Sequence, residues 1–137
     1  MQLPSSVTQA LAMLKAGGHE AYVVGGCVRD RLRGAEPADW DIATSDEVHF
    51  TPSLREDLAR RDFTVNAIAY SPESGIVDPF GGQRDLAAGL LRCVGEPNRR
   101  FEEDALRLLR ALRFSSVLGF SIEDRTAAAL HRRKELL

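Results

Sequence analysis

The sequence has few cysteines, few lysines and no long apolar run, and each shortage excludes a class of protein. Cys27 and Cys93 are too few and too far apart for a disulfide framework or a zinc site, so we expect both to be buried, reduced thiols. No stretch is long and apolar enough to span a bilayer, and the N-terminus lacks the charged-then-apolar pattern of a signal peptide. Repeats and low-complexity segments are also missing. These features predict a cytoplasmic globular protein without a membrane partner.

The charge balance gives no argument for a nucleic-acid partner, because the formal net charge is only −2. The basic residues are nevertheless almost all arginine, since Lys15 and Lys134 are the only lysines. The forked guanidinium group suits phosphate contacts, although a GC-rich genome would produce the same excess. A chain of 137 residues with 44% apolar residues can form one domain with a real core.

Apolar spacing and turn residues predict a mixed α/β head, residues 1–95, followed by a helical neck segment, residues 96–137. The neck stops while one side of its last helix, with Ile122, Ala129 and Leu130, has little left to pack against. This suggests a truncated neck or an oligomer. We expect Ser121 to cap the last helix, with Asp124 as its partner. The predicted helices are 6–15, 28–32, 54–67, 85–88, 99–118 and from 122 on, and the predicted strands are 21–24, 38–43, 68–70, 76–77 and 91–94.

Two aspartates one residue apart, Asp39 and Asp41, are the clearest sign of chemistry. In an extended strand, residues i and i+2 point to the same face, so both carboxylates could reach one point. Two hard oxygen ligands at this spacing suit Mg²⁺ held between a protein and a nucleoside triphosphate. An exposed pair in a loop is the plainer alternative. Trp40 would point to the opposite face, into the core.

A glycine turn precedes the aspartates. Gly25 and Gly26 would bring backbone N–H groups, at the start of a helix, close to a phosphate; a simple tight turn is the alternative. Arg29, one turn into this helix, could reach the same phosphate as a charged fork. We expect Asp30 to hold Arg29 or Arg33 in place.

The stretch LARRDFTVNA places several polar side chains among apolar ones, including Arg61, Asp62 and Asn66. Buried polar groups must be paired, so these residues either form a structural network or face a polar ligand. Asn66 could bind a ribose hydroxyl or a base edge. Asp85, in the later stretch DPFGGQRDL, is expected to be a cap or hinge partner and not a catalyst.

The predicted helix 99–118 has an apolar face and a charged face. A solvated helix with ordinary ion pairs would explain the charged face. Alternatively, Asp104 and Arg107 present an acceptor and a donor to the edge of a base. The apolar face carries Phe101, Ala105, Leu108, Leu109 and Leu112, and the charged face carries Glu103, Asp104, Arg107 and Arg110.

Four stretches, in this order, resemble the class II tRNA nucleotidyltransferase and bacterial poly(A) polymerase family: VVGGCVRDRLRG with DWDIAT, DLARRDFTVNAIAY, DPFGGQRDL and FEEDALRLLRALRF. They cover most of residues 20–120. The resemblance implies a polymerase-beta-type nucleotidyltransferase head that adds nucleotides to an RNA 3′ end without a nucleic-acid template. The implied ligands are two Mg²⁺ ions, CTP and ATP, and the implied partner is the tRNA 3′ end.

The resemblance also implies a role for each motif residue. Asp39 and Asp41 would be catalytic and hold the metal ions, and Gly25, Gly26 and Arg29 would contact the triphosphate. Arg61, Asp62 and Asn66 would contact the nucleotide or support its pocket. Asp104 and Arg107 would read the base, with Glu103 orienting Arg107 and Arg110 beside it. A fixed acceptor and a forked donor can select C and A without base pairing.

The sequence departs from the family between DWDIAT and DLARRDF. Some tens of residues, carrying a third metal-binding carboxylate and a mobile loop, are deleted or left out there. Val48 and Phe50 resemble the family's residues that follow this gap. Glu47 aligns better with that following segment than with the position of the third carboxylate. Without a third ligand the metal site would be weaker, because Mg²⁺ demands near-ideal octahedral coordination.

We therefore expect an enzyme that adds CCA to tRNA 3′ ends by two-metal in-line transfer. A poly(A) polymerase, or an enzyme that adds only CC or only A, is the close alternative. A non-catalytic fragment that binds nucleotide or RNA is the alternative from another class. The sequence does not predict the oligomeric state.

Overall fold

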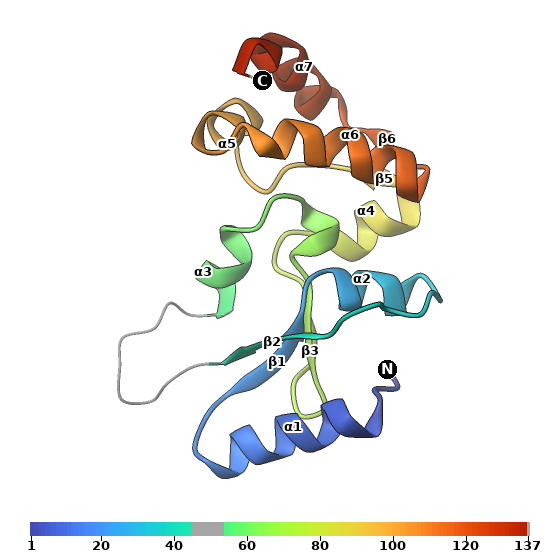
Figure 1. Cartoon of the computed structure of the whole chain (residues 1–137), viewed down its shortest axis with the longest axis vertical. Helices are drawn as coiled ribbons and strands as arrows, with labels where there is room; N and C mark the ends of the chain where they lie inside the picture. Colours follow the sequence, from blue (N-terminus) through green and yellow to red (C-terminus); the bar gives the residue numbers. More distant parts are fainter. Residues whose placement is uncertain (45–53, 137) are drawn as a thin grey trace.

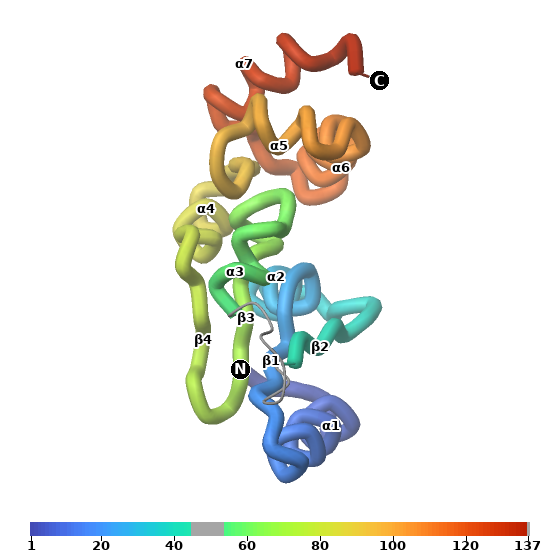
Figure 2. The backbone as a smooth tube through the Cα atoms, turned by 90° about the vertical axis from the view of Figure 1, so that its left-hand side faces the viewer, coloured from blue at the N-terminus to red at the C-terminus, as the bar shows by residue number. Residues whose placement is uncertain are grey.

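The computed structural model describes residues 1–44 and 54–136. Figure 1 shows a sheet in the lower half of the view, with α1 beneath it and α5, α6 and α7 stacked above it. Figure 2, turned by 90°, shows the same order along the long axis, from α1 at one end to α7 at the other. The mixed α/β architecture with a helical segment after it agrees with the prediction.

The sheet has four antiparallel strands in the order β2-β1-β3-β4. Its strands are β1 (Ala21–Val24), β2 (Asp41–Thr44), β3 (Ala69–Ser71) and β4 (Gly75–Val77). β1 occupies the predicted residues, and β3 and β4 form the predicted hairpin. In the register of β1 and β2, Val24 lies opposite Asp41. Asp41 is therefore set beside the turn at Gly25.

The helices of the head are α1 (Ser5–Ala16), α2 (Gly26–Leu32), α3 (Leu54–Ala59), the short 3-10 helix η1 (Thr64–Asn66) and α4 (Gly82–Ala88). Apolar residues of α1, β1 and α2 form one core, which includes Leu11, Val23 and Val28. Trp40 is partly buried and packs against this core, as expected. The burial of these side chains supplies the main driving force for this part of the fold.

The helical segment contains α5 (Pro97–Glu103), α6 (Leu106–Leu118), α7 (Asp124–Arg133) and the 3-10 helix η2 (Lys134–Leu136). Two short parallel strands, β5 (Leu90–Leu91) and β6 (Ser121–Ile122), join it to the head. Its core includes Phe101, Leu108 and Ala129 from the neck together with Phe63 and Cys93 from the head. Head and neck therefore share buried apolar surface.

Two predicted helices are interrupted. Residues 54–67 are not one helix, because Phe63 adopts an extended conformation, is fully buried and bridges to Cys93. Residues 99–118 are broken at Asp104, whose φ is −153° and ψ is 103°. In both places tertiary contacts or a local cap outweigh helix propensity. Because the break changes the helical wheel, Leu109 and Leu112 are about half exposed and do not share the buried face of Phe101.

The strand and helix ends also differ from the prediction. β2 begins at Asp41, so Asp39 lies outside it. Helix α7 is capped by Glu123, which accepts hydrogen bonds from the N–H groups of Arg125 and Thr126, and not by Ser121. The expectation that the last helix has little to pack against is wrong, because Ala129 is fully buried in the core that it shares with α5 and α6.

Candidate nucleotide-binding cleft

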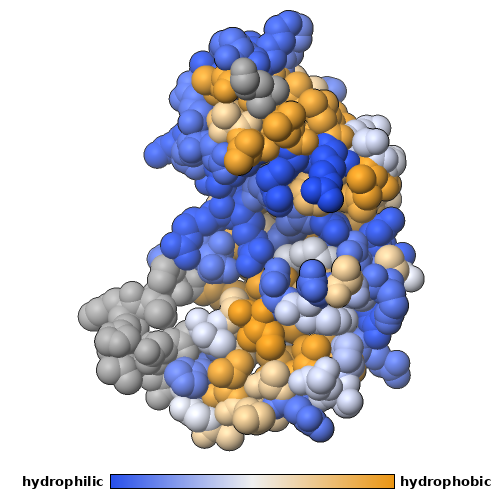
Figure 3. Space-filling model, in the orientation of Figure 1, coloured by the Kyte–Doolittle hydropathy of each residue, from blue (hydrophilic) through white to orange (hydrophobic). Residues whose placement is uncertain are grey.

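A cleft of about 520 Å³ lies between the head and the helical neck. Figure 3 shows hydrophilic side chains gathered across the middle of the molecule, between the apolar patches of the two parts. The residues that line the cleft are Gly26, Arg29, Asp41, Arg61, Asp62, Asn66, Asp104, Arg107, Arg110 and Phe114. All but Phe114 are site residues predicted from the sequence, whereas Gly25 and Asp39, also predicted, are not among them.

Arg29 enters the cleft from α2 and is held from two sides. Its Nε atom donates a hydrogen bond of 3.0 Å to Asp30 Oδ1, and its Nη1 atom donates one to Asn66 Oδ1. Asp30 also pairs with Arg33, at 3.4 Å. The expected role of Asp30 as a support is thus confirmed. Because Arg29 is only 9% exposed, its guanidinium is fixed in place before any ligand arrives.

Asp62 joins the head to the neck. Its Oδ1 atom accepts hydrogen bonds from the N–H of Phe63 at 2.7 Å and from Asn66 Nδ2 at 3.1 Å. Its Oδ2 atom accepts from Arg110, with 2.7 Å to Nε and 2.6 Å to Nη2. The sequence left open whether this stretch forms a structural network or faces a ligand. The structure shows the network, and these bonded residues also line the cleft.

Gly25 is required by its backbone and by a close neighbour. Its φ of +83° is a conformation that residues with a side chain rarely adopt. A Cβ atom at Gly25 would also lie 2.9 Å from Nη1 of Arg61. Its N–H donates to the carbonyl oxygen of Ile68 at 3.0 Å, so this group is already used within the protein. Only Gly26, of the two glycines, lines the cleft.

The two aspartates do not occupy equivalent positions. Asp41 is exposed and lines the cleft at the start of β2, whereas Asp39 is exposed but precedes the strand. The argument from strand alternation therefore does not apply to this pair. Within residues 1–44 and 54–136, neither carboxylate makes a hydrogen bond or an ion pair, although burial and, to a smaller extent, the charge of Asp41 raise the pKa of Cys27. Both are thus available to a cation.

The donor set suits Mg²⁺ in kind but is small. Carboxylate oxygens are the ligands that Mg²⁺ prefers. In the part of the chain that the structure describes, no three metal-ligating side chains come together. Glu47, Val48 and Phe50, which the sequence analysis discussed for this region, lie outside the described residues.

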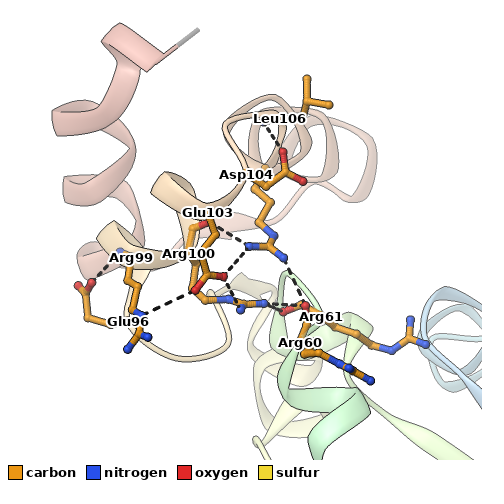
Figure 4. A network of polar contacts seen from close by, with 9 residues as sticks. Arg60, Arg61, Glu96, Arg99, Arg100, Glu103, Asp104 and Leu106 are labelled. Atoms are coloured by element: carbon orange, nitrogen blue, oxygen red, sulfur yellow. Dashed lines mark hydrogen bonds and ion pairs between the residues drawn. The ribbon is translucent and has the colours of Figure 1, made fainter. Parts of the chain in front are cut away.

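The predicted base readers stand at the break between α5 and α6. Asp104 accepts a hydrogen bond of 3.0 Å from the N–H of Leu106, the first residue of α6. Arg107 pairs with Glu103 at 3.2 Å, as expected. Arg107 also donates to the carbonyl oxygens of Arg100 at 3.0 Å and Arg60 at 3.3 Å. Figure 4 shows the network at this break.

Two cysteines and one aspartate behave as the sequence predicts. Cys27 and Cys93 are buried and unpaired with each other, and burial raises the pKa of Cys93 to about 11. Both side chains therefore stay neutral thiols at ordinary pH.

Asp85 is 1% exposed and accepts hydrogen bonds from Thr64 Oγ1 at 2.6 Å and Arg92 Nε at 3.1 Å. Its role is structural.

The sequence analysis missed Phe114. The Arg29 guanidinium lies 5.3 Å from the centre of the Phe114 ring, and the Arg110 guanidinium lies 5.0 Å from it. The same ring packs edge-on against Phe63, at 6.0 Å between centroids. Phe114 follows Arg110 by one helical turn, and this spacing was the available signal.

The comparisons with known proteins agree on one family. The family model of the poly A polymerase head domain matches residues 21–49 and 45–92. A CCA-adding enzyme of Lactiplantibacillus plantarum is 37% identical, over 99% of this chain and 46% of its own length. One from Geobacillus sp. is 39% identical, over 90% of this chain and 43% of its own length. The chain thus spans about half the length of these relatives.

Solved structures give the same result. The crystal structure of the Bacillus stearothermophilus CCA-adding enzyme in complex with CTP has a TM-score of 0.87 and 38% identity. The matched region includes 94% of this chain and 43% of the chain of the Bacillus stearothermophilus enzyme. A CCA-adding enzyme in complex with ATP has a TM-score of 0.83 and 29% identity. The match includes 96% of this chain and 41% of the chain of that enzyme. The fold is therefore that of a polymerase-beta-type nucleotidyltransferase head.

The length of one alignment exceeds the length of this chain. The match to the Lactiplantibacillus plantarum protein extends over 188 residues, although this chain has 137 in all. The family model matches in two pieces that meet at residues 45–49. The relative therefore carries residues that this chain lacks within the matched region, and their position near residues 45–46 stays a prediction.

Proposed function

This chain belongs to the poly A polymerase head domain family, and from that premise we propose that it is the nucleotidyltransferase head of an enzyme that adds C and A to tRNA 3′ ends. CTP and ATP would be its substrates. The observation that carries the proposal is the composition of the cleft: Asp41, an exposed carboxylate, lies with four arginine side chains around one cavity. A metal-bound triphosphate needs both kinds of group.

On this proposal the arginines bind the substrate. Arg29 is fixed by Asp30 and Asn66, so its guanidinium can meet phosphate oxygens with little loss of conformational freedom. Arg61 lies against Gly25 at the turn that leads into α2. Because glycine has no side chain, the arginine and the triphosphate can approach the backbone of the turn.

Asp39 and Asp41 would hold two Mg²⁺ ions. When bound, these ions lower the pKa of the RNA 3′-hydroxyl and stabilise the leaving pyrophosphate. Asp41 already lines the cleft, and Asp39 would complete the pair. The 3′-oxygen would attack the α-phosphorus as the bond to pyrophosphate breaks, so no covalent enzyme intermediate is needed.

Asp104 and Arg107 would read the base. Both belong to the neck segment and line the same cleft as Arg29. Arg107 uses three protein acceptors, and a base edge would replace some of them. Glu103 would keep the Arg107 guanidinium in orientation during this exchange.

A poly(A) polymerase is the second candidate, because the family model that matches this chain carries that name. A transfer assay separates the candidates. The chain is incubated with Mg²⁺, labelled CTP or ATP, and tRNA that ends before CCA. Addition of two C residues and then one A supports our proposal, and long tails from ATP alone support the polymerase.

The same assay tests the non-catalytic alternative. The small metal donor set among the described residues favours it for this chain. Binding of CTP without any transfer, also after insertion of the relatives' additional segment at residues 45–49, would contradict our proposal and support a binding module.

A further inference from the structure

We infer that Arg100 is a positioning residue for the nucleotide site: it holds the backbone of Arg60 and Arg61 so that Arg61 and Asp62 face the cleft. The nucleotide-binding part of this inference rests on the proposed function. The geometric part rests on contacts of the described residues alone.

One guanidinium group of α5 binds two consecutive carbonyl oxygens of the head. Arg100 Nη2 donates to the carbonyl oxygen of Arg60 at 2.7 Å and to that of Arg61 at 2.6 Å. Figure 4 shows the side chain of Arg100 reaching across to these two residues. Because a carbonyl is rigidly attached to its peptide plane, two such bonds fix the path of the chain at Arg60–Asp62.

The location of Arg100 makes these bonds strong. Its side chain is 12% exposed, and its Nη1 atom pairs with Glu103 at 2.9 Å. Hydrogen bonds from a charged donor are stronger when water is excluded. Burial, together with the nearby Arg107, lowers the pKa of Arg100. The lowered pKa reflects the unfavourable free energy of keeping a charged guanidinium at this site. The carbonyl oxygens and Glu103 offset this cost.

The segment that Arg100 holds carries groups of the cleft. The N–H of Phe63 and the amide of Asn66 both bind Asp62 Oδ1, and Arg110 binds its Oδ2. A shift of the chain at Arg61 would therefore move the Asp62 carboxylate away from these partners. Since Asn66 also binds Arg29, the displacement would extend to the arginine proposed for the triphosphate.

Arg100 also connects this segment to the proposed base reader. Its own carbonyl oxygen accepts a hydrogen bond of 3.0 Å from Arg107 Nη1. Arg107 Nη2 in turn binds the Arg60 carbonyl oxygen, at 3.3 Å. Arg107 therefore binds the backbone both at Arg100 and at Arg60. These are the two places that the Arg100 side chain connects.

The neighbouring Arg99 provides a matched control. It lies on the same helix and pairs with the same Glu103, at 3.7 Å, but its side chain is 81% exposed. Arg99→Ala therefore removes a cation and a Glu103 pair without removing a bond to Arg60 or Arg61. A difference between Arg100→Ala and Arg99→Ala isolates the carbonyl contacts.

The first test needs no nucleotide. Amide hydrogen exchange of the free chain should be about tenfold faster at residues 62–66 in Arg100→Ala than in the wild type, because local opening becomes easier. In Arg99→Ala it should stay within about twofold of the wild type. If the two variants exchange alike in this segment, Arg100 does not position it and the inference is overturned. Should Arg100→Ala not fold, Arg100→Lys compared with Arg99→Lys answers the same question.

The second test measures CTP binding with Mg²⁺ by calorimetry. We expect about tenfold weaker binding for Arg100→Ala, an intermediate value for Arg100→Lys and no change for Arg99→Ala. Equal affinities of wild type and Arg100→Ala would contradict the nucleotide part of the inference. A wild-type chain that binds no nucleotide would instead contradict the proposed function, while the exchange result would still decide the role of Arg100.

Discussion

The two ends of the cleft differ in how many of their polar side chains are hydrogen-bonded or ion-paired to other protein groups. At the aspartate end, Asp41 is exposed and, among the described residues, its carboxylate makes no hydrogen bond or ion pair. At the arginine end, Arg29, Asp62 and Arg107 are each bound to two or more protein groups. The arginine end is organised without a ligand, and the aspartate end is not.

This difference separates two kinds of residue that the sequence shows as equally polar. A carboxylate without a partner contributes little to stability and is available for a cation. A buried, cross-bonded carboxylate such as Asp62 contributes to stability and shapes the site at the same time. Substitutions at the two ends should therefore separate activity from stability.

The largest effect on activity should come from the aspartate end. We expect Asp41→Ala to lower nucleotide transfer by at least about a hundredfold, because a metal ligand is lost. Thermal unfolding should change little, since the exposed Asp41 carboxylate makes no hydrogen bond or ion pair with the described residues 1–44 and 54–136. Asp124→Ala, at the exposed start of α7, is the control. Normal turnover in Asp41→Ala would contradict its assignment as a metal ligand.

The largest effect on stability should come from the arginine end. Asp62→Ala leaves two N–H donors and the Arg110 guanidinium without their acceptor, and should cost about 3 kcal/mol of unfolding free energy. Asp57→Ala is the control, because Asp57 is 36% exposed and its pairs with Arg60 and Arg61 are 3.5 and 3.6 Å long. Denaturant unfolding measures both. Equal losses of unfolding free energy in Asp62→Ala and Asp57→Ala would show that the Asp62 network stabilises the protein no more than a partly exposed ion pair does.

A smaller effect should concern the choice of base. Arg107→Ala should reduce the preference for CTP over UTP by about tenfold, since a forked donor to the base edge is lost. Triphosphate binding should change less, because Arg29 remains. Competition binding with the four nucleotides gives both values. An equal loss for all four would make Arg107 a structural or phosphate-binding residue.

The smallest effect should come from the ring between the two arginines. Phe114→Leu keeps most of the apolar volume but removes the cation–π contacts with Arg29 and Arg110, so CTP should bind about fivefold more weakly. Phe114→Tyr should retain the affinity. Phe120→Leu, in a residue that packs against the same core, should have no effect. If Phe114→Leu binds CTP as the wild type does, the ring does not position the arginines.

The sequence predicted the fold and most of the cleft because both depend on local patterns. β1 and the hairpin of β3 and β4 follow from short apolar runs and turn residues, and the polar residues of RRDFTVN follow from their odd position among apolar ones. These signals lie within a few residues of one another. They can be read without knowledge of distant contacts.

Most of the parts that failed depend on long-range contacts. The extended backbone at Phe63 requires the bridge to Cys93. The break at Asp104 is accompanied by a local hydrogen bond from the Leu106 N–H to the Asp104 carboxylate, which a helical wheel does not include. Arg100 and Phe114 acquire their importance from residues far away in the sequence. A helical wheel treats residues 99–118 as one continuous helix, so it placed Leu109 and Leu112 on the same apolar face as Phe101, although both are about half exposed.

The most direct test of the account is a calorimetric titration of the wild-type chain with CTP, with and without Mg²⁺. If the organised arginine end binds phosphate and the open aspartate end binds the metal, CTP should bind saturably, and Mg²⁺ should strengthen binding in the wild type but not in Asp41→Ala. No binding of CTP, or an equal effect of Mg²⁺ on the wild type and on Asp41→Ala, would contradict it.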